Sequence, residues 1–289
     1  DRTVGEQELT VSYAGDDDYK DSTAKATITI TKGNATVSVN SQKITYGESF
    51  QTPIFTASPE EAKVIGLIVG ITASGEKYAS IDLSNVTIND IAGTNIPVYG
   101  NKSVQDVMKS PGMTSIKVGQ LPELFEKIQG LIGSGSDIAG AISGIEKVLG
   151  ILEKVVPGIY DVTLHIGELP TEAGLYTAAG MTVNSNYNTA IGVGTLTIAQ
   201  KKTDSKLVFN QKISNKHNRL TAAEAENFDF GGHIEVDGNA VGDTTGIKTY
   251  YVGKKATGET VASETPILED GEYIETVSII GGNYLATPI

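Results

Sequence analysis

Alternating and helical apolar patterns divide this chain into β-rich stretches and one helical stretch. Every second residue from Ala24 to Ile30 is apolar, and threonines fill most positions between them. A period of two is typical of a half-buried strand. Residues 62–71 form a continuous apolar run, which predicts a strand buried on both faces. Residues 80–88 alternate again and predict another strand.

Between about 98 and 157 the apolar period changes to three and four residues, which predicts helices. Residues 133–136 interrupt the pattern, and either Ser136 or Asp137 is expected to cap a second helix that ends before Pro157. A short helical turn is expected at 103–109. The two apolar stripes are Leu121, Leu124, Phe125, Ile128, Leu131 and Ile132, then Ile138, Ile142, Ile145, Leu149, Leu152 and Val156.

A strand–turn–strand signature recurs along the chain. Gly174-Leu-Tyr176 precedes Asn186-Tyr187, and Gly271-Glu-Tyr273 precedes Asn283-Tyr284 at the same spacing. A related stretch runs from Gly5 to Asp18-Tyr19 and on to a Thr- and Ile-rich strand. A repeated supersecondary unit indicates an array of similar modules.

These signatures resemble bacterial immunoglobulin-like repeats of large cell-surface proteins. Gly-x-Tyr, Asn-Tyr and the Gly194-Thr-Leu-Thr-Ile198 strand carry the resemblance, and Tyr46-Gly47 is similar to the opening of such repeats. The resemblance implies β-sandwiches strung along a stalk. The expected fold class is therefore mainly β: tandem immunoglobulin-like sandwiches, the central one with an α-helical hairpin insertion.

Three parts are expected on this basis. Residues 1–32 would be the closing strands of a partial unit, and 33–200 a domain with the helical insertion at about 98–157. Residues 201–289 would be a further domain without its last strand. The polar start carries no signal peptide, so we expect a piece of a longer protein.

Composition narrows the classes of function. A net charge of −13 repels nucleic acid, and no basic stripe offsets it. The chain has no cysteine, so neither disulfides nor thiolate metal sites can form. No apolar run reaches the roughly 18 residues of a membrane span. We expect an extracellular protein of a bacterial cell surface, without membrane insertion of this segment.

Candidate chemistry is sparse. His165, His217 and His233 lie far apart in sequence, without metal-ligand spacing, and are expected to be ordinary strand histidines. Gly133–Asp137 lacks the Lys of a phosphate-binding loop. No nucleophile–base set is visible, so enzyme activity and an obligatory cofactor are not expected.

Two clusters could bind a ligand. Asp16, Asp17 and Asp18 could hold calcium, against the simpler interpretation of a solvated hairpin turn. Tyr250 and Tyr251 could stack on a sugar, or they could alternate into and out of a strand.

The expected function is a structural or adhesive segment, a stalk or binding module acting through loops and the helical insertion. Its partner would be an unidentified protein or glycan of a host or neighbouring cell. Two alternatives stay open. One is a surface filament that self-assembles by strand exchange, and the other is a carbohydrate-binding accessory module of a secreted enzyme.

Overall fold

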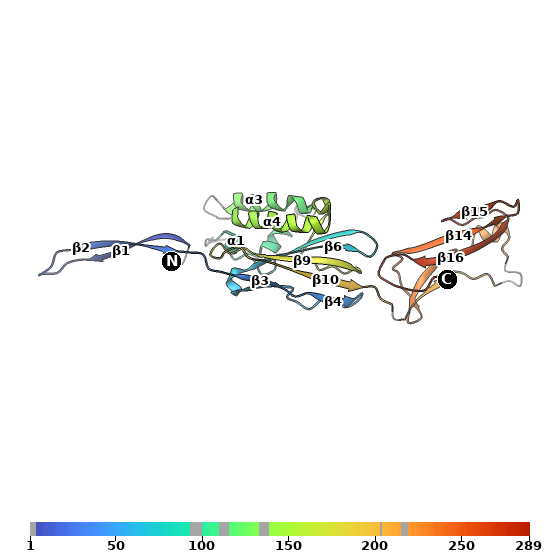
Figure 1. The fold of residues 1–289 in the computed structure, drawn as a ribbon, viewed down its shortest axis with the longest axis horizontal. Helices are drawn as coiled ribbons and strands as arrows, with labels where there is room; N and C mark the ends of the chain where they lie inside the picture. Colours follow the sequence, from blue (N-terminus) through green and yellow to red (C-terminus); the bar gives the residue numbers. More distant parts are fainter. Residues whose placement is uncertain (1–3, 93–99, 110–115, 133–138, 203, 215–218) are drawn as a thin grey trace.

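The computed structural model describes residues 4–92, 100–109, 116–132, 139–202, 204–214 and 219–289. Three β-rich parts follow one another along an elongated molecule (Figure 1). We call them the N-terminal hairpin (residues 5–30), the middle module (33–200) and the last module (201–289). The coarse prediction of a mainly β protein with sandwich-like packing is confirmed by these sheets.

The N-terminal hairpin consists of β1 (Gly5–Tyr13) and β2 (Ser22–Ile30). The strands pair antiparallel along their full length, from Gly5 opposite Ile30 to Tyr13 opposite Ser22. The expected strand at 23–32 is present, but the expected half-burial is wrong. Nearly every side chain of β2 is exposed, because no second layer covers the hairpin among the described residues.

A six-stranded sheet in the order β4-β10-β9-β6-β7-β8 organises the middle module. Most neighbours pair antiparallel, and β4 and β8 join the two edges in parallel. A two-stranded sheet of β3 and β5 packs against one face. The bounds are β3 Thr36–Val39, β4 Gln42–Thr45, β5 Phe55–Ser58, β6 Val64–Thr72, β7 Lys77–Asp82, β8 Leu164–Ile166, β9 Gly174–Thr182 and β10 Ile191–Ala199.

Strand β6 runs through the centre of this module and is buried from Val64 to Gly70, as its apolar sequence predicts. Gly66 lies opposite Gly180 of β9, and the two glycines leave room for the ring of Phe55 from the second sheet. A Cβ on Gly66 would lie 2.1 Å from Phe55 Cε2. Glycine at this position thus sets how closely the two sheets approach.

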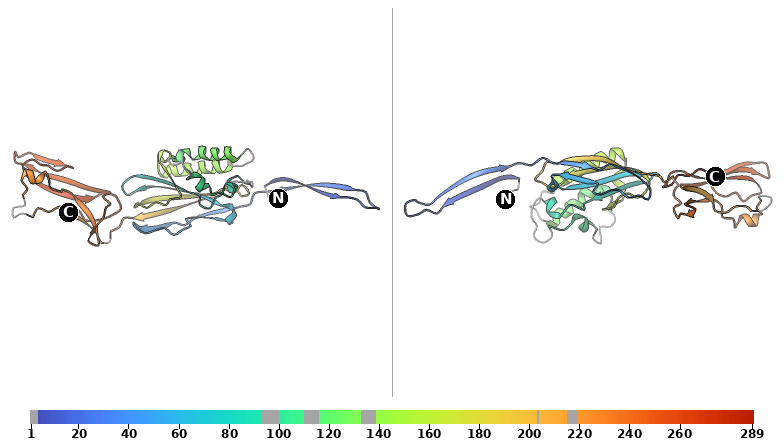
Figure 2. Two further views of the ribbon diagram at one scale, coloured as in Figure 1. Left: turned by 180° about the vertical axis from the view of Figure 1, so that it is seen from behind. Right: turned by 90° about the horizontal axis from the view of Figure 1, so that it is seen from below.

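Two helices, α3 (Leu121–Ile132) and α4 (Ala139–Val155), cover the other face of the six-stranded sheet. Figure 2 shows them on one side of it, opposite the β3–β5 layer. The two predicted helices are therefore present. The expected cap of the second helix, either Ser136 or Asp137, lies outside the described residues. Helix and sheet residues share the largest core, which includes Leu121, Phe125, Ile128, Ile145, Leu149, Leu152, Ile65, Leu67, Ala179 and Met181.

The stretch at 80–88 differs from its prediction. Strand β7 ends at Asp82, whose carboxylate accepts a hydrogen bond from the Ser84 amide and begins a turn. Leu83 and Val86 are nevertheless fully buried, because the turn places their side chains in the core between the sheet and the helices. Short helices α1 (Ile88–Ala92) and α2 (Val104–Met108) follow, and Ser103 caps α2, so the expected helical turn at 103–109 is present.

The last module contains two three-stranded sheets, in the orders β11-β12-β13 and β15-β14-β16. Its fully or nearly buried apolar residues are few, with Leu207, Ile234, Val277 and Tyr284 at the centre. The bounds are β11 Ser205–Phe209, α5 Ala222–Ala225, β12 Gly232–Val236, β13 Asn239–Ala240, β14 Ile247–Lys255, β15 Thr260–Ser263 and β16 Gly271–Ile279.

Candidate functional site

The Gly-x-Tyr signature builds the same corner in both modules. The Tyr176 hydroxyl donates to the main-chain oxygen of Glu172 at 2.7 Å, and the Tyr273 hydroxyl donates to that of Glu269 at 3.0 Å. Each hydroxyl folds back over the glycine two residues earlier. A Cβ on Gly174 would lie 2.9 Å from the Tyr176 hydroxyl, so any larger residue would obstruct the bond.

The facing strand uses another glycine. Tyr176 pairs with Gly70 of β6, and Tyr273 pairs with Gly253 of β14 in the same register. A Cβ on Gly253 would come within 2.1 Å of the Glu272 main-chain oxygen. Strands β14 and β16 therefore repeat β6 and β9, although the sequence signal covered only one strand of each pair.

The Asn-Tyr signature marks where each module receives the chain from the preceding part. The amide of Gly33 donates to Asn186 O, and Asn188 N donates to Gly33 O, at 2.9 and 2.8 Å. In the last module Lys201 N donates to Asn283 O, and Leu285 N donates to Lys201 O, at 2.8 and 2.9 Å. Both contacts are parallel bridges, Gly33 with Tyr187 and Lys201 with Tyr284.

Asn283 goes further and ties the middle module to the last one. Its side chain is 2 % exposed. Asn283 Oδ1 accepts a 2.7 Å hydrogen bond from the amide of Ala173, directly before β9. Asn283 Nδ2 donates to the carboxylates of Glu172 and Asp243, the second at 3.0 Å. One buried amide thus joins two modules, and a buried polar group held on both sides is costly to separate.

Aromatic and acidic groups surround this joint, which we define as Tyr46, Glu172, Ala173, Asp243, Asn283 and Tyr284. Tyr46 and Tyr284 meet edge to face with ring centroids 5.3 Å apart. Burial, with the nearby Asp243 charge, raises the pKa of Tyr284. Burial alone would raise the pKa of Asp243, but hydrogen bonds from Thr245 and Asn283 outweigh it and lower that pKa.

Close backbone approach completes the joint. Gly281 and Gly282 have φ values of +77° and +79°, which favour glycine. A Cβ on Gly281 would lie 2.4 Å from the Ala73 main-chain oxygen of the middle module. Gln200 Nε2 donates to Gly282 O at 2.8 Å. The joint is thus packed on its glycine side as well as hydrogen-bonded.

The corresponding position before the middle module is only half built. Asn186 repeats the place of Asn283, but its Oδ1 is buried and has no hydrogen-bond partner within the described part of the chain. The donor equivalent to the Ala173 amide would be the amide of Val4. Val4 directly precedes β1, just as Ala173 directly precedes β9.

The acidic cluster lies in the loop of the N-terminal hairpin. Asp16 Oδ1 accepts the amides of Asp18 and Tyr19 at 2.9 and 2.8 Å, and its Oδ2 accepts the Tyr13 hydroxyl. The hydrogen bond from Tyr13 is the main cause of the lowered pKa of Asp16. Across the described ranges, no group of three or more His, Cys, Asp or Glu residues is placed to hold a metal. Calcium binding by Asp16, Asp17 and Asp18 stays a prediction.

The two neighbouring tyrosines of β14 point to opposite faces. Tyr250 is 46 % exposed, whereas Tyr251 is 4 % exposed. The Tyr251 hydroxyl donates to Glu275 Oε1 at 2.9 Å, and burial raises its pKa. The structure therefore does not bring both rings to one surface, and the alternating interpretation describes their placement.

The histidines lie apart. His165 Nδ1 lies 3.1 Å from Glu168 Oε2, and its ring stacks on Tyr78. His233 Nδ1 lies 3.0 Å from Asn210 Oδ1. His217 lies outside the described residues.

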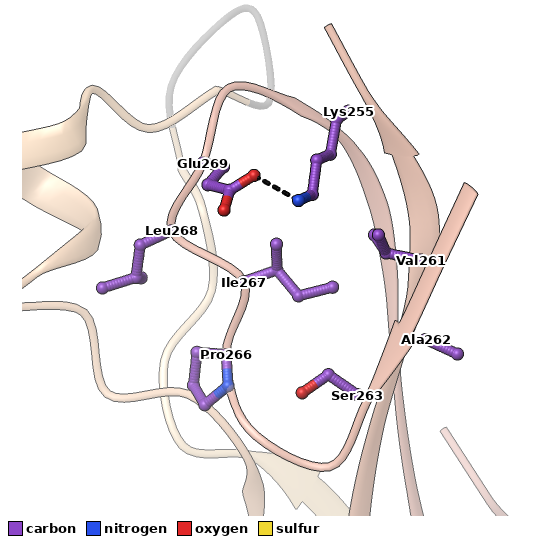
Figure 3. A pocket seen from close by; sticks show the side chains of 8 residues that line it. All are labelled: Lys255, Val261, Ala262, Ser263, Pro266, Ile267, Leu268 and Glu269. Atoms are coloured by element: carbon purple, nitrogen blue, oxygen red, sulfur yellow. Dashed lines mark ion pairs between the residues drawn. The ribbon is translucent and has the colours of Figure 1, made fainter. Parts of the chain in front are cut away.

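An open pocket of about 540 Å³ lies in the last module between β15 and the following loop (Figure 3). Apolar residues such as Val261, Ile267 and Leu268 line it, with Lys255 at one end. The Lys255 ammonium pairs with Glu269 at 2.7 Å and Glu259 at 3.1 Å. These hydrogen bonds raise its pKa, so the charge is already compensated by two carboxylates.

No helix in the described ranges is both long and apolar enough to cross a bilayer. No known protein family matches the sequence, and no curated protein matches it either. Among solved structures, the chain is similar to a tetra-tandem repeat in the extending region of a large adhesion protein. The identity is 9 % and the TM-score 0.30, with 98 % of this chain and 55 % of that one covered. The chain thus spans about half the length of that structure, and a likeness this weak carries no argument.

Sequence reasoning found the Asn-Tyr signature but missed what it contacts. Glu172 and Asp243 were not singled out, because they lie 111 and 40 residues from Asn283. The signal that could have found the joint is the repeat itself. The same Asn-Tyr turn recurs where one module follows another. Its asparagine side chain could therefore have been expected to lie between the modules.

Proposed function

We propose that this chain is a non-catalytic spacer segment of a bacterial cell-surface protein, built from end-to-end immunoglobulin-like modules with a stiff joint. The observation that carries this proposal is the side chain of Asn283, buried between the middle and last modules and bonded to both. A joint that resists bending keeps distant parts of a surface protein apart. The net charge of −13 suits an extracellular position.

Contact with a protein or glycan of another cell is the adhesive side of this proposal. No described feature favours a particular ligand. Only Tyr250 of the tyrosine pair is exposed, which does not support the carbohydrate-binding alternative. The charge of Lys255 in the open pocket is already paired, which gives an anionic ligand little to gain.

Paired spin labels test the stiffness of the joint. The chain has no cysteine, so Leu175→Cys and Ile274→Cys place one label on each module at exposed sites, 63 % and 70 % accessible. We expect a narrow distribution of distances between the labels. In Asn283→Ala the distribution should broaden, because the Ala173 amide and two carboxylates lose their shared partner.

Asn186→Ala is the matched control, because it removes the same residue type from the equivalent turn of the middle module without touching this joint. It should leave the label distances unchanged. A broad distribution in the parent chain, or the same width in parent and Asn283→Ala, would contradict a stiff spacer.

A further inference from the structure

We infer that the N-terminal hairpin is the closing pair of a separate β-sandwich, and that its apolar face binds a partner built like residues 201–270. Such a partner has a strand like β14 whose edge is open where β16 pairs in the last module, together with an apolar inner face. The inference deepens the proposed spacer function, since it adds a module to the array.

The first argument is register. Gly5 pairs with Ile30 as Gly174 pairs with Ile198, and the pairing continues in step along both hairpins. Strands β1 and β2 therefore repeat β9 and β10 position by position. The corresponding pairs are Gln7–Ile28 with Tyr176–Leu196, Leu9–Ala26 with Ala178–Gly194, and Val11–Ala24 with Gly180–Gly192.

The second argument is burial. In the middle module the inner face of this hairpin is covered: Tyr176 and Leu196 are 0 % exposed and Ile198 is 3 % exposed. In the N-terminal hairpin the same face is apolar but open, with Leu9 47 %, Val11 70 % and Ile28 46 % exposed. Gln7 is a polar residue on this face, at the place of Tyr176. An exposed, largely apolar face of this kind is typical of a surface that another element covers.

The opposite face of the hairpin identifies the kind of partner. It is polar, and Glu8 pairs across it with Lys25 at 2.7 Å. In the middle module the outer face of β9 carries Ala179 and Met181, which pack under the helices. Among the described residues of the last module, no helix covers the outer face of β16, where Ile274 is 70 % exposed. The partner therefore resembles the last module, without a helical layer.

The third argument is the half-built joint. Asn186 Oδ1 is buried and has no partner among the described residues, while Asn283 Oδ1 in the equivalent place accepts the amide that precedes β9. When a partner fixes β1 in a sandwich, the Val4 amide is positioned to donate to Asn186 Oδ1. A buried acceptor without a donor is unfavourable, so completing this bond favours the assembly.

A second copy of the present chain is a poorer occupant. Its last module already has β16 beside β14 along nine residue pairs, so β1 has no position there unless β16 leaves. Strand exchange between copies would therefore break one hairpin in order to complete another.

A grafted chain tests the inference. Residues 271–289 are replaced with residues 5–32, so that β1 takes the place of β16 beside β14. The chain ending at residue 270 gives the baseline, and the middle module is the internal reference for folding. We expect the graft to restore slow amide exchange in β14, at least tenfold slower than the baseline, and to protect the grafted β1 and β2. Unprotected β14 and hairpin amides in the graft would overturn the inference.

Two pairs of substitutions in the graft test which face is used. Leu9→Asp with Val11→Asp, made in the grafted copy, should abolish protection. Thr10→Asp with Ser12→Asp alters the opposite face and should preserve it. Equal effects of the two pairs would overturn the inference.

Sedimentation of the parent chain tests the competing occupant. Dimerisation that Leu9→Asp and Val11→Asp prevent would show that a second copy covers this face, and would also overturn the inference. Spin-label distances across the Asn283 joint do not depend on the hairpin face. A failed graft with a stiff joint therefore contradicts the added module alone, and a flexible joint contradicts the spacer.

Discussion

The middle and last modules share a β frame but differ in what covers it. Both place a Gly-x-Tyr corner opposite a strand glycine, and both receive the chain at an Asn-Tyr turn. In the middle module helices α3 and α4 bury the outer face of the sheet, whereas the last module has a small core around Leu207, Ile234 and Val277. The corner and the turn therefore specify the frame, while the largest core forms where the helical layer covers the sheet.

Removing the helical layer should have the largest effect on this comparison. Deletion of residues 119–157 with a short glycine linker exposes the face of β6 and β9 that packs on α3 and α4. Each large side chain uncovered costs about 1.5–3 kcal/mol, and several together exceed the roughly 5–15 kcal/mol that stabilises a domain. We expect the middle module to unfold while the last module keeps its slow-exchanging amides. A cooperatively folded middle module would show that the helices are a grafted surface.

Substitution of Gly66 tests the tight approach of the two sheets in the middle module. In Gly66→Ala the new methyl group would overlap the buried ring of Phe55, so we expect a loss of about 1–3 kcal/mol in urea unfolding of the middle module. Gly130→Ala is the control, because nothing lies within 4 Å of its Cβ position on α3. It should stabilise the module by up to about 1 kcal/mol. Equal stability of the two variants would contradict the packing.

Removing one hydroxyl from each corner sharpens the comparison further. Tyr176→Phe leaves the main-chain oxygen of Glu172 without its partner beside a ring that is 0 % exposed, and should cost about 1 kcal/mol. Tyr273→Phe should cost less, because Tyr273 is partly exposed and water can replace its hydroxyl. Unfolding of each module by urea measures both changes. A larger loss at Tyr273 would reverse the expected order.

Acid should act on the joint with the smallest effect. Hydrogen bonds lower the pKa of Asp243 below its ordinary value of 3.8. Its charged form therefore stabilises the folded joint above about pH 4, and this contribution is lost as the pH falls through the lowered pKa. Label distances across the joint should broaden as the pH falls below about 4. In Asp243→Asn the width should change less over this range; an equal change would assign the acid effect elsewhere.

Periodicity predicted the local elements correctly where the spacing of apolar residues matched a regular strand or helix. The alternation of β2, the apolar run of β6 and the stripes of α3 and α4 each produced the expected element. It was wrong for residues 83–88, where the same alternation buries side chains from a turn. An apolar residue can enter a core from any backbone shape, so the pattern alone could not distinguish the two.

Much of the candidate site was beyond sequence reasoning. The repeated Asn283-Tyr284 turn was visible, and its role between modules was not. Asp16–Asp18 and Tyr250–Tyr251 were chosen because adjacent residues of one type suggest a shared site. In the structure the Asp16 carboxylate accepts hydrogen bonds from amides of its own turn, and the two tyrosines lie on opposite faces of β14.

The sequence by itself determined the strand and helix types and the repeated corner, because these depend on spacing within a few residues. Only the tertiary structure decided that helices cover one sheet, that Asn283 contacts Ala173, and that Oδ1 of the equivalent Asn186 has no donor within the described ranges. Those contacts join residues far apart along the chain. They depend on which buried surfaces meet and which polar groups are satisfied there, and local spacing contains no record of either.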